Sequence, residues 1–181
     1  NVNIMHIEGG KNDIFTNANG DILATIKGNQ TQLKHIPNGE NLGYDILMFH
    51  DRKNAEKVFK AIADQSKNEW SLIETSEYGK GFVSTSYGRM EERANILILN
   101  NLNRYKISNI WRHIHSHPNV RELHASQNSG DMDVIKKYMN TSGVRNAKWY
   151  IYGPAAGYML QYHYKYPQRI VNINEIFRFI K

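Results

Sequence analysis

Hydrophobic positions recur with helical spacing in the stretch that follows Asp51. The apolar residues there are separated by three and four positions, and charged residues fill much of the space between them. The apolar positions are Ala55, Val58, Phe59, Ile62 and Ala63. Because an α-helix makes one turn in 3.6 residues, this spacing turns one apolar stripe toward a core. The pattern predicts an amphipathic helix that begins after Asp51.

Short apolar runs of strand length fill most of the remaining chain. Before the helix they lie at residues 4–7, 14–15 and 22–26, and after it at 70–74, 82–87, 96–99, 110–117, 148–152 and 158–164. The Asn19-Gly20 pair between two of the early runs is typical of a β-hairpin turn. Residues 36–39 read Ile-Pro-Asn-Gly and predict a turn that closes this first section.

Two further helices complete the pattern. One is expected from about Gly130 to Asn140, and a short closing helix is expected at residues 175–180 with Asn174 as its cap. Helices interspersed among many strands indicate an α/β fold, in which a mixed β-sheet is flanked by helices. We expect an N-terminal β-hairpin extension at residues 1–45 and one domain at residues 46–181.

Composition narrows the classes of protein that fit. The chain has 181 residues, a formal net charge of +6 and no cysteine. The missing cysteine excludes a disulfide scaffold, a thiolate-bound zinc and a cysteine nucleophile. The longest aliphatic run, residues 96–99, is far shorter than the ~20 residues that span a bilayer. The basic residues are scattered with no run of three, which favours neither a membrane nor a nucleic-acid partner.

Three histidines alternate in the run that ends at Pro118. If this run is a strand, His113, His115 and His117 project from one face, with alternate residues about 6.6 Å apart. Proline cannot continue the ladder, so the last two histidines lie at the end of the strand, where a cleft can open. We expect His115 and His117 to bind a metal ion and His113 to be a structural ring. His124 is expected to be a loop residue.

An aspartate in the first turn of the helix at residues 130–140 is the expected third ligand, since carboxylates suit the positive end of a helix dipole. If Asp131 faces the metal, the positions three, four and seven residues later are apolar. They are Val134, Ile135 and Tyr138. If Asp133 faces it, two of those positions are lysines, which would turn toward the sheet. Two histidines, Asp131 and a water form an open tetrahedral site of the kind in which Zn²⁺ activates water.

These residues resemble a family of zinc hydrolases. The string His115-Ser116-His117-Pro118, followed by a Ser/Asp element that opens a helix, is similar to the JAB/MPN/JAMM metalloproteases. Their pattern is an upstream Glu, then His-Ser/Thr-His-Pro, then Ser-x-x-Asp. The resemblance covers about residues 51–164 and implies a zinc-dependent peptidase or isopeptidase that acts on a protein or peptide.

The resemblance also implies a catalytic glutamate near the start of an early core strand. Glu69 directly follows the predicted amphipathic helix and precedes an apolar run, so it fits that place. There it would be the general base beside the water and would later protonate the leaving amine. Glu74 and Glu77 are rivals for the role, and a solvated carboxylate at a helix–strand junction is the non-catalytic alternative.

The chain departs from the family pattern at the serine. Ser126 stands at the expected distance after Pro118, but the residue three positions later is Ser129 and not aspartate. Asn128 is the residue three positions before Asp131. We assign the serine's role, donation of a hydrogen bond to the tetrahedral oxyanion, to Ser129, with Asn128 and Ser126 as alternatives.

The N-terminal part resembles a second group. Its Asn-Gly turns, many asparagines and start without methionine are similar to the C-terminal toxin modules of bacterial polymorphic (Rhs-like) effectors, which include a JAB-like toxin group. This resemblance implies a piece of a larger secreted effector, a target inside another cell and a cognate immunity protein. A metal-dependent nuclease toxin and a non-catalytic MPN-like binding module remain alternatives.

Overall fold

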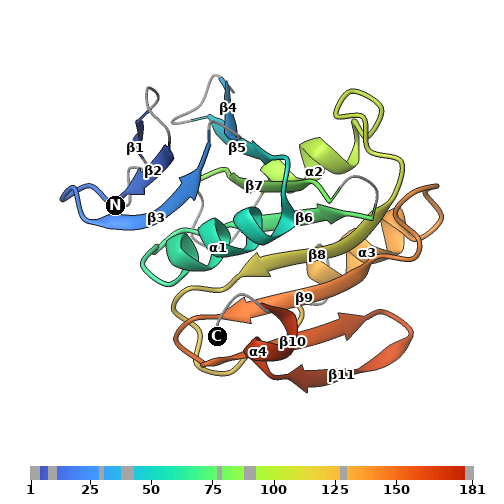
Figure 1. Ribbon diagram of the computed structural model, residues 1–181. Helices are drawn as coiled ribbons and strands as arrows, with labels where there is room; N and C mark the ends of the chain where they lie inside the picture. The colour runs from blue at the N-terminus through green and yellow to red at the C-terminus, as the bar shows by residue number, and fades with distance from the viewer. Residues whose placement is uncertain are drawn as a thin grey trace.

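The fold is built on an eight-stranded mixed β-sheet (Figure 1). The computed structural model describes residues 5–7, 12–28, 31–37, 43–76, 79–87, 93–126 and 130–177, with the backbone alone for 5–7. The strand order is β11 (Tyr166–Val171), β10 (Tyr158–His163), β9 (Lys148–Gly153), β8 (Ile110–Ser116), β6 (Ser71–Thr75), β7 (Gly81–Thr85), β5 (Tyr44–Phe49) and β4 (Thr31–Ile36). Strands β8 and β9 run parallel, and the other neighbours run antiparallel. The expected mixed sheet flanked by helices is confirmed.

A small second sheet precedes the large one. It contains β1 (Met5–Ile7), β2 (Asn12–Thr16) and β3 (Ile22–Lys27) in antiparallel order. The predicted hairpin at Asn19-Gly20 joins β2 to β3, and Gly20 takes the positive φ of 85° that such a turn favours. The boundary placed between residues 45 and 46 falls inside β5, which pairs with β4 in the large sheet. The division into two units stays a prediction.

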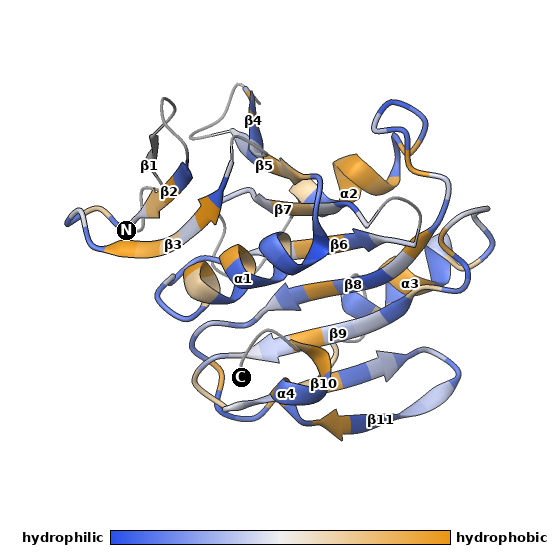
Figure 2. Cartoon of the chain, viewed as in Figure 1, coloured by the Kyte–Doolittle hydropathy of each residue, from blue (hydrophilic) through white to orange (hydrophobic). Residues whose placement is uncertain are grey.

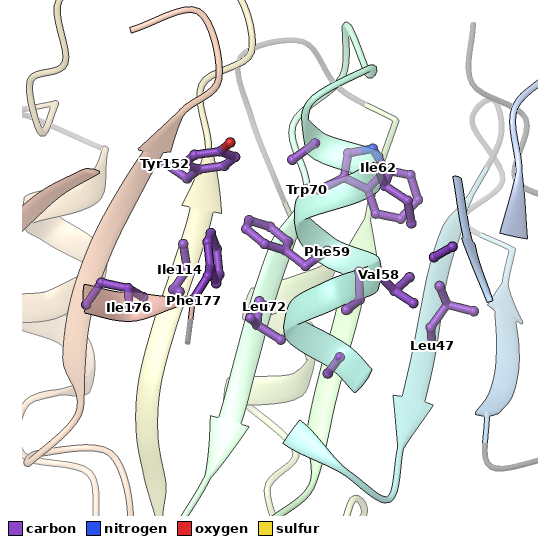
Figure 3. Packing of buried hydrophobic residues seen from close by; sticks show 14 of the residues in the cluster. Leu47, Val58, Phe59, Ile62, Trp70, Leu72, Ile114, Tyr152, Ile176 and Phe177 are labelled. Atoms are coloured by element: carbon purple, nitrogen blue, oxygen red, sulfur yellow. The ribbon is translucent and has the colours of Figure 1, made fainter. Parts of the chain in front are cut away.

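Helix α1 (Arg52–Ala63) covers one face of the large sheet (Figures 1 and 3). Its start is fixed by Asp51, whose Oδ1 accepts a hydrogen bond from the Lys53 N–H at 2.8 Å. The predicted apolar stripe is confirmed, because each of its five residues is at most 1% exposed. Phe59 contacts the ring of Phe177 with 6.0 Å between ring centroids, so the C-terminal part of the chain joins this core. Burial of each of the larger side chains in the stripe, Val58, Phe59 and Ile62, stabilises the fold by about 1.5–3 kcal/mol.

Helix α3 (Asp131–Tyr138) lies on the other face as the crossover between the parallel strands β8 and β9. A connection between two parallel strands must cross one face of the sheet, and a helix is its usual form. The helix predicted from about Gly130 is therefore confirmed. None of the helices within the described ranges is long and apolar enough to cross a membrane.

Two predictions of local structure are wrong. Residues 96–99 belong to a helix, α2 (Ala94–Leu99), and not to a strand. Its buried positions, Ala94, Asn95, Ile98 and Leu99, follow a helical period, which a run of four apolar residues cannot reveal (Figure 2). The closing helix is α4 (Ile173–Ile176), whose cap is Asn172 rather than Asn174. Residues 178–180 of the predicted helix lie outside the described residues.

A buried arginine joins α1 and α4 to the centre of the sheet. Arg112 of β8 is 3% exposed, and its Nη2 lies 2.5 Å from Oε1 of Glu56 on α1. Its Nε donates to Glu74 of β6, and its Nη1 donates to the carbonyl of Ile176 at 3.2 Å. Two carboxyl groups thus share one guanidinium. Burial, and then the negative charge of Glu74, raise the pKa of Glu56 to about 8.

Replacement of Glu56 by glutamine should make stability less sensitive to pH. With its pKa raised from 4.5 to about 8, the folded chain holds a proton that the unfolded chain releases. Stability linked to this proton is therefore present below about pH 4.5 and lost as the pH rises to about 8. Thermal unfolding followed by circular dichroism should show the midpoint falling more between pH 5 and 8 for the wild type than for Glu56→Gln. The exposed Glu122→Gln should behave as wild type, and equal falls in all three proteins would contradict the raised pKa.

Candidate metal centre

Strand β8 presents two different faces to the two halves of the molecule. Arg112 and Ile114 point to the side of α1, whereas His113 and His115 point to the side of α3. The strand ends at Ser116, and the His117 N–H still donates to the carbonyl of Tyr152 on β9 at 2.9 Å. The predicted strand is confirmed up to Ser116. His117 therefore begins the loop but is held at the end of the sheet.

Helix α3 turns its first residue toward these histidines. Ile135 and Tyr138 are buried against the sheet as predicted, Val134 is only half-buried, and Met132 is buried instead. Asp133 lies on the outer side of the helix and pairs with the exposed Lys136 at 3.4 Å. Asp131, the first residue of the helix, instead lies next to His115 of β8.

Three ligand atoms converge at this point. Nε2 of His115 lies 2.9 Å from Oδ1 of Asp131 and 3.1 Å from Nε2 of His117. Each residue offers one ligand atom, and all three atoms lie within 4.8 Å of one another. Tetrahedral Zn²⁺, with bonds of 2.0–2.1 Å, keeps its ligand atoms roughly 3.3 Å apart. The spacing therefore suits three ligands of one ion, and this group is a candidate metal site.

The charge states of the cluster also suit a metal ion. Burial, and then the charge of His115, lower the pKa of His117 to about 4. Burial alone would raise the pKa of Asp131, but the charge and hydrogen bond of His115 hold it well below its usual range. At neutral pH His117 is thus neutral and Asp131 is ionised. These are the forms that bind metal ions.

Glu69 lies at the rim of the cluster. It precedes β6, which runs antiparallel to β8 with Ser71 opposite His115. Because Glu69 comes two residues before Ser71 and His117 two residues after His115, the same register places Glu69 opposite His117. Its carboxylate Oε1 lies 3.7 Å from Nε2 of His117, and the residue is 6% exposed. The backbone here is fixed, because the Glu69 carbonyl accepts a hydrogen bond from Thr85 Oγ1 at 2.8 Å. The carboxylate is therefore beside the three ligand atoms without being one of them.

The other candidates of the sequence fall in different places. Glu74 is on the opposite face of the sheet, where it accepts a hydrogen bond from Arg112, so it is remote from the histidines. Glu77, Asn128 and Ser129 lie outside the described residues, and the role assigned to Ser129 stays a prediction. His124 is exposed in the loop after Pro118.

Other buried side chains surround the cluster. His113 is fully buried, with its ring 4.7 Å from that of Trp149 and its Nε2 2.9 Å from Nδ2 of Asn95 on α2. Burial, and then the charge of His115, lower its pKa to about 3, so it remains a neutral ring as a structural role requires. Tyr162 of β10 packs edge-on against His115, with 6.0 Å between ring centroids. Asn95 and Tyr162 are distant in sequence, and only the sheet topology brings them here.

Comparison with known proteins gives one family. Residues 47–136 match the family model described as JAB-like toxin 1. Neither the curated proteins nor the solved structures include a match to the chain. The matched residues contain α1, Glu69, both histidines of the cluster and Asp131. The chain thus contains a JAB-like toxin domain over residues 47–136.

Proposed function

We propose that the chain is a zinc-dependent metallopeptidase of the JAB/JAMM type that hydrolyses a peptide or isopeptide bond in a protein or peptide. The observation that carries the proposal is the convergence of His115 Nε2, His117 Nε2 and Asp131 Oδ1, with the Glu69 carboxylate beside them. The family match over residues 47–136 supports it.

The donor set suits Zn²⁺. Two imidazole nitrogens and one carboxylate oxygen are borderline and hard ligands, and they match the three protein ligands of many catalytic zinc sites. A zinc ion held there would polarise the carbonyl of the scissile bond and lower the pKa of a water at its open position. The three residues would thereby fix where the carbonyl carbon and the water meet.

Glu69 supplies the proton transfers in this proposal. Its carboxylate accepts a proton from the attacking water as the oxygen bonds to the carbonyl carbon. The same carboxyl group then gives that proton to the nitrogen as the carbon–nitrogen bond breaks, and the products are a carboxylate and an amine. Burial of Glu69 at 6% exposure keeps bulk water from competing for the proton. Ser129 is proposed as the hydrogen-bond donor to the oxyanion.

The biological setting follows from the family. A JAB-like toxin domain suggests the toxic part of a larger effector that is secreted or delivered into the cytoplasm of a target cell. The partners of such a domain would be its protein substrate and a cognate immunity protein. We propose no membrane or nucleic-acid partner, because the proposed substrate is a protein.

The proposed activity can be tested on a peptide library derived from a bacterial proteome. Mass spectrometry should find new amino termini with the zinc-loaded chain and none after a chelator. Cleavage of nucleic acid in place of peptides under the same conditions would instead identify a nuclease. Zinc binding without either activity, on this library and on an isopeptide-linked protein, would identify a binding module.

One equivalent of zinc per chain is expected after purification without added metal. Inductively coupled plasma analysis should show a sharp loss of zinc in His115→Ala and His117→Ala, because each variant removes one of three protein ligands. His124→Ala is the matched control, since that ring is exposed in the adjacent loop. Equal loss of zinc in His124→Ala would show that the assignment of the metal ligands is wrong.

The two aspartates of α3 should differ in the same zinc analysis. Asp131→Asn removes a charged ligand whose Oδ1 lies 2.9 Å from His115 and should lose the metal. Asp133→Asn removes a charge on the outer side of the helix and should keep it. The reverse result would contradict the orientation of α3.

Glu69→Gln should keep zinc and lose turnover. The amide preserves the size of the side chain but cannot accept the proton, and general base catalysis typically contributes about 10²–10⁴-fold. Initial rates on a cleaved library peptide, measured beside zinc content, check this. The exposed Glu122→Gln should be fully active. A zinc-loaded Glu69→Gln with wild-type turnover would contradict the role of Glu69 as the base.

A further inference from the structure

One serine makes three hydrogen bonds to the aspartate of the candidate metal site. The backbone N–H and the hydroxyl of Ser126 both donate to Oδ2 of Asp131, at 2.8 and 2.9 Å. In return, the Asp131 N–H donates to Ser126 Oγ at 2.9 Å. The two residues therefore hold each other from both the backbone and the side chain.

These hydrogen bonds give the two carboxylate oxygens of Asp131 different partners. Oδ2 of Asp131 has two donors from Ser126, whereas Oδ1 points to His115 at 2.9 Å, among the candidate ligand atoms. Hydrogen bonds to the second oxygen of a ligating carboxylate fix its orientation and favour its charged form. Asp131 is thus prepared to offer one oxygen in one direction.

Ser126 is itself anchored to the sheet and to α3. Just before it, the Leu123 N–H donates to the Tyr158 hydroxyl at 3.0 Å, and the Ala125 N–H donates to Gln168 Oε1 at 3.4 Å. On the other side, the Met132 N–H donates to the Ser126 carbonyl at 3.1 Å. The position of the hydroxyl is therefore set by β10, β11 and α3 together.

We propose that Ser126 is a positioning residue for Asp131 and not a donor to the oxyanion. A hydroxyl has one proton, and that of Ser126 is already directed to Asp131 Oδ2. The inference rests on the metal-binding part of the proposed function and not on peptidase activity. It also gives the departure from the Ser-x-x-Asp spacing a physical meaning, because Ser126 stands five residues before the aspartate and still reaches its side chain.

A purely structural role for Ser126 makes a different prediction. Its oxygen also accepts a hydrogen bond from the first turn of α3, as a helix cap does, so its loss would weaken the fold. A cap changes stability but leaves the metal affinity of the folded protein unaltered. The N-cap residue of α3 is Gly130, so Ser126→Ala and Ser126→Gly both remove the hydroxyl without changing the cap residue itself.

The test is the affinity of the metal-free chain for Co²⁺, measured by competition with a chromophoric chelator. Ser126→Ala and Ser126→Gly should bind about 10- to 100-fold more weakly than wild type, as is usual when the partner of a ligand is removed. Ser126→Thr, which retains the hydroxyl, should bind as wild type. The absorption band of bound Co²⁺ should also shift in Ser126→Ala and Ser126→Gly, because a freed carboxylate can bind through both oxygens.

The matched control is Asp51→Ala, which removes the cap of α1 on the opposite face of the sheet. It should lower the unfolding temperature without changing Co²⁺ affinity. If Ser126→Ala does not fold, Ser126→Gly carries the test. Wild-type affinity in the folded Ser126 variants, equal loss in Asp51→Ala, or a Ser126→Thr as weak as Ser126→Ala would overturn the proposal. Because no substrate is present, this outcome is independent of whether the chain is a peptidase.

Discussion

The two-residue period of β8 is the constraint on which the rest of the structure depends. Even positions of this strand face α1, where Arg112 and Ile114 enter the core, and odd positions face α3, where His113 and His115 lie. A slip of one residue would exchange the two faces, placing imidazoles against α1 and a guanidinium on the side of Asp131. The antiparallel register with β6 also brings Glu69 opposite the end of the strand. One alignment therefore sets the core and the candidate site together.

Buried charge is kept in separate places on the two sides of the sheet. On the side of α1, Glu56 and Glu74 both pair with Arg112, so the charge of the guanidinium is offset by neighbouring carboxyl groups. On the side of α3, the ionised Asp131 faces two imidazoles, one of which, His117, is neutral at pH 7. This second group gathers three ligand atoms, one of them an oxygen of the ionised Asp131. A bound metal ion would therefore complement the negative charge of this group.

The sequence could predict those features that depend on local period. The amphipathic stripe after Asp51 and the alternation around His115 both survive in the structure, because helix and strand periods dictate which side chains share a face. It could not predict α2, since four consecutive apolar residues fit a strand or a helix equally. It also missed β11, where five of six residues are exposed. No alternation of hydropathy marks this strand (Figure 2). The contact between Ser126 and Asp131 depends on the path of a loop, which no spacing rule contains.

Two imidazoles and one carboxylate are expected to hold a single zinc ion. X-ray absorption at the zinc edge measures this directly in the zinc-loaded chain. We expect a first shell of four nitrogen and oxygen atoms at about 2.0–2.1 Å, with outer-shell scattering from two imidazole rings. Scattering from three rings, which would bring in His113 or His124, or a shell of six oxygens, would contradict the account.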